Sequence, residues 1–249
     1  MTRIASHRGG TLEFGDSTPR GFAATSLMKL EEVEFDVHPT SDGGIVVHHD
    51  ATLDATTDIA GEIAQMTLDQ VRAATIRYSA GGHPLTLDEL CSIYANSHVN
   101  FRCEIKPGVD GMPYKGFVSR VVSLLQSRSM LERTTFSSFL LRSMDDIAVA
   151  TNRPSLWLVS PPVLRQLGQD AVIELSKAHG IREIGVHIDT AEAALKKALL
   201  DAGVEFGCWA AHTTRQIEKA LKLGVKVFTT DRPSLAIAIR ETFRAGGAR

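Results

Sequence analysis

Short runs of β-forming apolar residues alternate with helical patterns along nearly the whole chain of 249 residues. Between two such runs, Phe117, Val121 and Leu124 recur at helical spacing. Strand–helix alternation favours parallel strands joined by right-handed crossovers, and eight such units in about 250 residues match a (β/α)8 TIM barrel. A doubly wound open sheet has the same alternation of strands and helices, so the strand count does not exclude this second fold. The eight predicted strands are Arg3–Ser6, Val33–Val37, Val99–Ile105, Thr134–Ser138, Ser155–Val159, Glu183–His187, Val204–Trp209 and Val225–Thr229.

The stretch between the second and third predicted strands is longer than one helix and two loops require. Within it, Asp42-Gly43-Gly44 predicts a tight turn followed by a short returning strand, and Thr67 and Thr86 each begin a capping-box pattern that predicts a helix. We expect a small insertion over about 42–98, on the catalytic face of a single domain that spans 1–249.

The composition excludes several classes of protein. With 43% hydrophobic residues the chain can build a core, and a net charge of -2 argues against a general nucleic-acid binder. The longest apolar stretches, such as Leu235–Ile239, are far shorter than the roughly 20 residues that span a bilayer, and the N-terminus lacks a signal-peptide pattern. We expect a cytoplasmic protein without membrane insertion, and a homodimer is compatible with this composition.

Carboxylates lie at the ends of the second and third predicted strands. Glu34 and Asp36 are two residues apart, so strand alternation places both on one face, about 6.6 Å apart along the strand. Glu104 and Lys106 repeat this spacing. Taken alone, Glu34 and Asp36 could be two solvated acids at a strand end, and Glu104 and Lys106 could be a structural ion pair at the barrel rim. Together, the three acids suit a hard cation such as Mg²⁺ or Ca²⁺, and the lysine suits an anionic substrate.

Two histidine-bearing segments follow predicted strands. His7 and Arg8 come directly after the first, where an imidazole can move a proton and a guanidinium can bind phosphate oxygens. His48 and His49 are adjacent, so alternation allows only one of them to face the pocket. An ordinary polar loop residue is the alternative for a single histidine at such a position.

His187 and Trp209 end the sixth and seventh predicted strands. At the mouth of a barrel they can line the alcohol portion of a substrate. For Trp209, a buried aromatic residue is the alternative.

A series of sequence blocks along the chain resembles the glycerophosphodiester phosphodiesterase family. No single block is specific, but they occur in the family's order and cover nearly the whole chain. The blocks are Ser6-His7-Arg8-Gly9, Glu34-Phe35-Asp36-Val37-His38-Pro39-Thr40-Ser41-Asp42-Gly43, Val46-Val47-His48-His49-Asp50, Pro84-Leu85-Thr86-Leu87-Asp88-Glu89-Leu90, Glu104-Ile105-Lys106-Pro107, Ser137-Ser138-Phe139 and Thr230-Asp231-Arg232-Pro233.

The resemblance implies a (β/α)8 barrel that hydrolyses glycerophosphodiesters, such as glycerophosphocholine or glycerophosphoethanolamine, to glycerol 3-phosphate and an alcohol. It implies a divalent cation, Mg²⁺ or Ca²⁺ with Mn²⁺ as a further option. His49 is favoured over His48 because the family's histidine directly precedes Asp. The implied site consists of metal ligands Glu34, Asp36 and Glu104, the acid–base pair His7 and His49, and the phosphate-binding residues Arg8 and Lys106.

The chain departs from the family pattern at two positions. Arg20 follows Pro19 where the family usually carries Glu, and Ala55 stands where it tends to have Arg. We therefore expect Arg20 to contact a substrate group other than plain glycerol. A specialised diester, such as a sugar phosphodiester, and a barrel that binds a phosphodiester without cleaving it are the alternatives. An amidohydrolase-type metal barrel is disfavoured because it needs His-x-His after the first strand.

Overall fold

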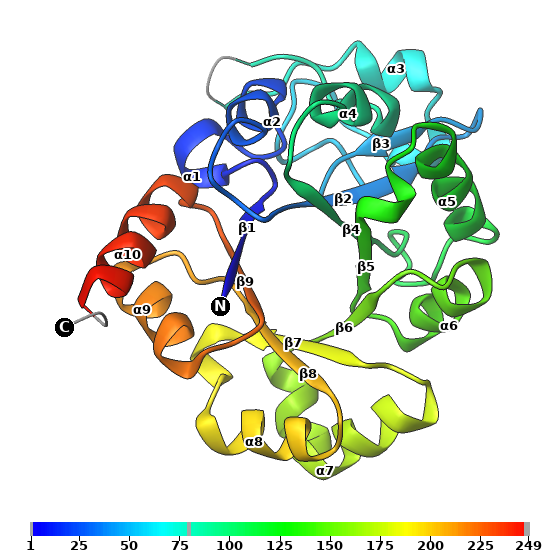
Figure 1. The fold of residues 1–249 in the computed structure, drawn as a ribbon. Helices are drawn as coiled ribbons and strands as arrows, with labels where there is room; N and C mark the ends of the chain where they lie inside the picture. The colour runs from blue at the N-terminus through cyan, green and yellow to red at the C-terminus, as the bar shows by residue number, and fades with distance from the viewer. Residues whose placement is uncertain (1, 79–80, 247–249) are drawn as a thin grey trace.

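In the computed structural model, which describes residues 2–78 and 81–246, eight parallel strands form a closed barrel surrounded by helices (Figure 1). The barrel closes because β1 pairs in parallel with both β2 and β9. This confirms the predicted (β/α)8 barrel and excludes the open sheet. The strands are β1 (Arg3–His7), β2 (Glu32–Pro39), β3 (Ile45–Val47), β4 (Asn100–Ile105), β5 (Thr134–Ser138), β6 (Ser155–Val159), β7 (Glu183–His187), β8 (Glu205–Trp209) and β9 (Val227–Thr230), of which β3 lies outside the barrel.

Helices cover the outside of the barrel, and their ends follow local sequence signals. The helix α9, for example, begins where the Thr213 side chain accepts a hydrogen bond from the Gln216 amide, and ends at Gly224 in a left-handed conformation. No helix in the described part of the chain is long and apolar enough to cross a membrane. The helices are α1 (Thr11–Phe14), α2 (Pro19–Thr25), α3 (Leu68–Arg72), α4 (Leu87–Tyr94), α5 (Phe117–Ser127), α6 (Leu141–Ala150), α7 (Pro161–Ala178), α8 (Ala193–Asp201), α9 (Thr214–Leu223) and α10 (Pro233–Gly246), with 3-10 turns at Ile63–Gln65, Leu131–Arg133 and Ile188–Thr190.

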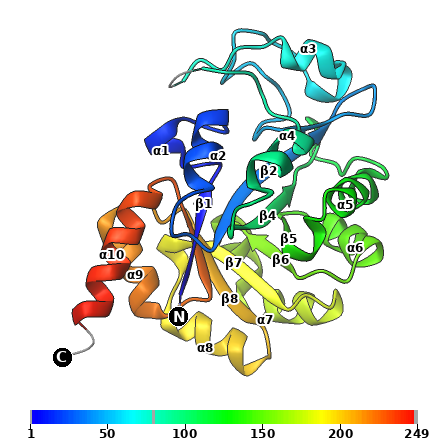
Figure 2. The ribbon, with the colours of Figure 1, turned by 45° about the horizontal axis from the view of Figure 1, so that its top comes forward.

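The described residues between β2 and α4 lie within the stretch, about 42–98, where the sequence predicts an insertion. After the turn at Asp42, β3 runs back antiparallel to β2, and α3 stands away from the barrel (Figure 2). Capping boxes at Thr67 and Thr86 begin α3 and α4 as predicted. This segment has its own small apolar cluster, and α4 lies beside α2 and α5 in the outer ring (Figure 1). The cluster contains Val46, Leu53, Ile63, Val71 and Ala74.

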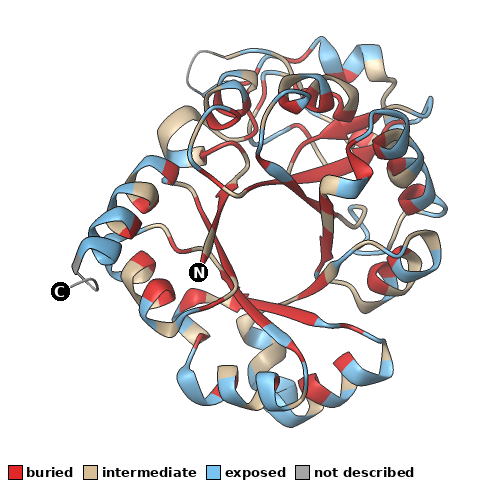
Figure 3. Ribbon diagram, in the orientation of Figure 1, coloured by how far each residue is buried: buried red, intermediate tan, exposed pale blue. Residues whose placement is uncertain are grey.

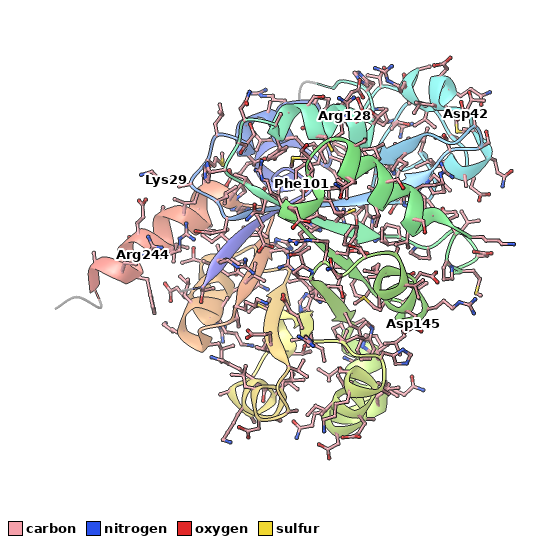
Figure 4. The ribbon with its side chains drawn as sticks, turned by 45° about the vertical axis from the view of Figure 1, so that its right-hand side comes forward. Lys29, Asp42, Phe101, Arg128, Asp145 and Arg244 are labelled. Carbon is pink, nitrogen blue, oxygen red and sulfur yellow. The ribbon has the colours of Figure 1, made fainter. Side chains whose placement is uncertain are left out.

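The main hydrophobic core lies between the strands and the helices, so the strands are largely buried (Figure 3). Alternate residues of β2, Val33, Phe35 and Val37, point outward into this core. Phe101 on β4, labelled in Figure 4, packs edge-to-face on Phe35 with ring centroids 4.9 Å apart. The remaining residues of the strands therefore face the barrel axis, where polar side chains collect.

Buried ion pairs fill the barrel interior at the N-terminal ends of the strands. Arg102 Nε donates to Glu32 Oε2 at 2.6 Å, and its Nη1 lies 3.5 Å from Glu183 Oε1. Lys226 Nζ donates to the other Glu183 oxygen at 2.6 Å, and Arg3 pairs with Glu32 at 3.1 Å. Because this end is filled, polar side chains at the opposite end are the ones that can face a ligand.

Candidate active site

Three buried carboxylates meet inside the barrel near the C-terminal ends of β2 and β4. The register pairs Asp36 with Glu104, and strand alternation brings Glu34 to the same face. One carboxylate oxygen from each residue lies within 4.8 Å of the others. The sequence prediction that these three acids share one site therefore agrees with the geometry.

Several oxygens of these carboxylates accept no hydrogen bond of normal geometry from a described residue. They are Glu34 Oε2, both Asp36 oxygens and Glu104 Oε1. Burial and the neighbouring Asp36 carboxylate raise the pKa of Glu34 to about 8. Burial also raises the pKa of Glu104, an effect that Lys106 partly offsets. Buried oxygens on clustered acids that accept no hydrogen bond of normal geometry are the donor set that a hard divalent cation takes, so the residues fit such an ion.

Arg8 and Lys106 place two positive charges beside these acids. Lys106 Nζ lies 3.0 Å from Glu104 Oε1 and 3.5 Å from Asp36 Oδ1, while Arg8 Nε lies 3.2 Å from Asp36 Oδ2. Burial alone would raise the pKa of Asp36, but Lys106 and Arg8 outweigh it and the pKa is lowered. Arg8 also donates to Asp16 at 2.7 Å, which fixes its guanidinium at the mouth. Both cations line the cavity, where an anionic group can reach them.

The loop after β1 is held by close backbone contacts. Arg8 and Gly9 have φ of 48° and 75°, a left-handed conformation that costs glycine little and is uncommon for arginine. A Cβ on Gly21 would lie 2.7 Å from the Gly9 carbonyl oxygen, so α2 packs directly against this loop. The Arg8 amide donates to the Glu34 carbonyl at 2.9 Å, which ties the loop to β2.

His7 lies at the end of β1, next to Glu34 in the strand register. Its Nδ1 is 2.5 Å from Asp231 Oδ1, and its Nε2 is 3.8 Å from Glu34 Oε2. Burial alone would lower the pKa of His7, but Glu34 and Asp231 outweigh it and the pKa is raised. A carboxylate on Nδ1 orients the ring and leaves Nε2 toward the acids.

His49 and His48 point in different directions, as strand alternation predicts. His49 lines the cavity with its Nδ1 2.6 Å from Asp50 Oδ1, and burial lowers its pKa. His48 is buried in the inserted segment, where it contacts Thr56 Oγ1 at 2.7 Å. His38 Nε2 lies 3.1 Å from the His49 carbonyl oxygen, a contact that supports the His49 loop.

A cavity of about 250 Å³ opens above the carboxylates. On the β6 to β8 side its wall is apolar, and the side chains of Leu156 and Leu158 pack closely over Gly185. Trp209 lines this wall, and its buried Nε1 has no hydrogen-bond partner among the described residues. His187 stacks edge-on against Trp209 with ring centroids 4.7 Å apart and is not part of the cavity wall. Its contact with the cavity is through Trp209.

Comparison with known proteins decides the family. The model of the glycerophosphoryl diester phosphodiesterase family matches residues 7–235, nearly the whole chain. The chain belongs to this family. It is therefore a phosphoric diester hydrolase, and the resemblance found in the sequence is confirmed.

Relatives of this phosphodiesterase cover almost its full length. A curated glycerophosphodiester phosphodiesterase from Caldanaerobacter subterraneus subsp. tengcongensis is 25% identical and is aligned over 99% of both chains. A crystal structure of a putative glycerophosphoryl diester phosphodiesterase from Agrobacterium tumefaciens is 71% identical, with a TM-score of 0.97 over 98% of this chain and 99% of that one. A phosphodiesterase from Oleispira antarctica, solved with the product sn-glycerol-3-phosphate, shares the fold at 19% identity and a TM-score of 0.80, over 97% of each chain.

Three polar residues of the phosphodiesterase site had no role assigned from the sequence. Asp231 holds His7, Asp16 holds Arg8, and His212 lines the cavity beside His7. Asp231 stands at the end of the last strand inside a family block, a position that could have indicated its role. Arg20, in contrast, is exposed on α2 and is not part of the cavity wall, so its predicted substrate contact has no support in the cavity.

Proposed function

We propose that this phosphodiesterase is metal-dependent and hydrolyses glycerophosphodiesters, such as glycerophosphocholine or glycerophosphoethanolamine, to glycerol 3-phosphate and an alcohol. The observation that carries the proposal is the cluster of buried carboxylates of Glu34, Asp36 and Glu104, which meet within 4.8 Å of one another beside two fixed cations. The Oleispira antarctica enzyme, which has the same fold, was solved with sn-glycerol-3-phosphate, and this supports the product assignment.

Glu34, Asp36 and Glu104 would hold one divalent cation, Mg²⁺ or Ca²⁺ with Mn²⁺ as an alternative. Their all-oxygen donor set favours hard ions over Zn²⁺. When all are ionised, the three acids and Asp16 carry four negative charges against the two positive charges of Arg8 and Lys106, and a divalent ion can neutralise that excess. When bound, the ion would neutralise charge on phosphoryl oxygens as it builds during the reaction.

Arg8 and Lys106 would bind and orient the phosphoryl group. Asp16 and the neighbouring acids hold both side chains at the cavity wall before a ligand arrives, so little side-chain ordering is left to the binding step. The apolar wall would bind the organic part of the diester. Trp209 forms part of this wall, and His187 packs against the Trp209 ring.

His7 and His49 would be the general acid and base. Each has its Nδ1 engaged by a carboxylate, which leaves Nε2 of each ring for a substrate proton. One takes a proton from the attacking oxygen while the other gives a proton to the leaving alcohol, so the two start in opposite protonation states. The attacking oxygen belongs to water or to the neighbouring glycerol hydroxyl, and the second route gives a cyclic phosphate first.

Hydrolysis of glycerophosphocholine and bis(p-nitrophenyl) phosphate with Mg²⁺, Ca²⁺, Mn²⁺ or EDTA tests the proposal. Glu104→Ala is measured alongside, with exposed Glu241→Gln as the control. We expect EDTA and Glu104→Ala to abolish cleavage and the control to keep it. Full activity in EDTA would refute metal dependence, and metal binding without cleavage of either substrate would point to the non-catalytic alternative.

A further inference from the structure

His212 is a third histidine at the cavity, and the sequence blocks gave it no role. It follows β8 in the turn that leads to α9. Ala210 has a φ of 64° there, and the Ala211 amide donates to the Thr229 carbonyl on the neighbouring strand β9 at 3.0 Å. These contacts bend the chain over the barrel mouth (β8 and β9 are adjacent in Figure 1), and the ring of His212 comes to 6.1 Å from that of His7.

The backbone fixes which nitrogen of His212 carries the proton. The Asp231 amide donates to His212 Nδ1 at 3.0 Å, so this nitrogen must be an acceptor. A neutral ring with Nδ1 as acceptor has its proton on Nε2. No residue of the described chain accepts a hydrogen bond from that Nε2, although the ring borders the cavity. His212 therefore offers one oriented donor to whatever fills the cavity.

Asp231 sets different tasks for the two histidines that it contacts. Its carboxylate oxygen lies on His7 Nδ1 and favours the protonated ring, as an acid–base group requires. Its amide donates to His212 Nδ1, and its other carboxylate oxygen lies farther from that nitrogen, at 3.4 Å. Burial lowers the pKa of His212 and outweighs the opposite effect of the Asp231 charge. The geometry therefore favours a neutral His212 that donates a hydrogen bond from Nε2.

The position of His212 indicates which part of a ligand it meets. The metal ligands, Arg8 and Lys106 come from β1, β2 and β4 or the loops that follow them, and they account for the phosphate. His212 follows β8 and borders the apolar wall that includes Trp209. One oriented donor beside an apolar wall matches a hydroxyl oxygen on the carbon chain of a polyol.

We propose that His212 donates a hydrogen bond from Nε2 to a hydroxyl of the glycerol part of the ligand, and so selects polyol phosphates over alkyl phosphates. This inference rests on the proposed function, because it assumes that a glycerol phosphate group occupies the cavity. A site that pairs a ligand hydroxyl rejects the analogue without it, because the donor of the protein is then left unpaired.

Binding of sn-glycerol 3-phosphate and of propyl phosphate, measured by calorimetry in the presence of Mg²⁺, tests the proposal. Propyl phosphate has the same three carbons and phosphate but no hydroxyl. We expect the wild type to prefer sn-glycerol 3-phosphate by at least about tenfold. His212→Phe should lose about tenfold for that ligand and stay within about twofold for propyl phosphate.

Two further variants sharpen the result. His212→Gln can keep a donor near the Nε2 position and should retain part of the preference. His98→Phe removes an exposed histidine at the opposite end of the barrel and should behave as the wild type. Circular dichroism and thermal melting check that each variant is folded.

Equal weakening of both ligands by His212→Phe would overturn the proposal, because His212 would then act on the phosphate or on the loop. No weakening of either ligand, or no preference in the wild type, would also overturn it. Turnover of glycerophosphocholine is measured separately. If the wild type prefers sn-glycerol 3-phosphate over propyl phosphate but does not hydrolyse glycerophosphocholine, only the proposed reaction is refuted. If the wild type hydrolyses glycerophosphocholine but shows no such binding preference, only the role of His212 is refuted.

Discussion

Neutralising Glu34 should stabilise the metal-free protein, although it removes a predicted metal ligand. Two like unit charges 4.8 Å apart, the outer limit among these carboxylate oxygens, repel by about 3.5 kcal/mol at an effective dielectric constant of about 20. Ionised Glu34 meets two such carboxylates, Asp36 and Glu104, while Arg8 and His7 offset part of the repulsion. A pKa of about 8 leaves Glu34 largely protonated near neutral pH, so folding must take up a proton that the unfolded chain, with its usual pKa of 4.5, does not hold. Glutamine avoids this cost, and we expect Glu34→Gln to gain about 1–3 kcal/mol near neutral pH.

Thermal unfolding in EDTA measures this gain, and about 2–4 °C per kcal/mol is expected for a chain of this size. Adding Ca²⁺ or Mg²⁺ at about 100 times its dissociation constant should then stabilise the wild type by about 2.7 kcal/mol and Glu34→Gln by less. Exposed Glu241→Gln is the matched control and should follow the wild type in both conditions. A Glu34→Gln protein that is less stable than the wild type in EDTA would show that burial of the Glu34 carboxyl group does not destabilise the fold. An equal gain from metal would show that Glu34 is not a metal ligand.

Two further outcomes follow from the structure. His7→Asn and His49→Asn should each lower kcat by roughly 10²–10⁴ with little change in melting temperature, and a rate near that of the wild type in steady-state assays would contradict the assigned role. Burial would raise the pKa of Glu183, but Arg102 and Lys226 outweigh it, so the pKa is lowered from its usual 4.5. Its ionised form therefore stabilises the fold above about pH 4.5, and this contribution is lost as the pH falls through the lowered value. Glu183→Gln should cost about 3–5 kcal/mol in urea unfolding at pH 7 and much less at pH 3, and equal losses at both pH values would contradict this.

The barrel and its carboxylates could be predicted because the evidence is local in the sequence. Alternation along β2 alone places Val33 and Phe35 outward and Glu34 inward, and this requires no knowledge of the rest of the fold. Once a parallel barrel is inferred, the ends of neighbouring strands meet, so Glu104 must join the acids of β2. Capping boxes at Thr67 and Thr86 are equally local.

The roles of Asp231 and His212 could not be predicted, because they depend on contacts between distant parts of the chain. The Asp231 carboxylate reaches His7, 224 residues away, only because the last strand pairs with the first. His212 follows a strand end by three residues, and only the left-handed Ala210 turns it back over the mouth. Arg20 is the opposite case. Its charge differs from the family pattern, so the sequence suggested a substrate contact, but Arg20 is not part of the cavity wall.

A crystal structure with Mn²⁺ and sn-glycerol 3-phosphate, analysed by the anomalous signal of the metal, tests whether Glu34, Asp36 and Glu104 hold the proposed cation beside the phosphate. We expect one Mn²⁺ peak among the three carboxylates, with the phosphate between that peak and Arg8 and Lys106. A peak at other ligands, or a phosphate bound away from both Arg8 and Lys106, would show that the metal and phosphate sites are assigned wrongly.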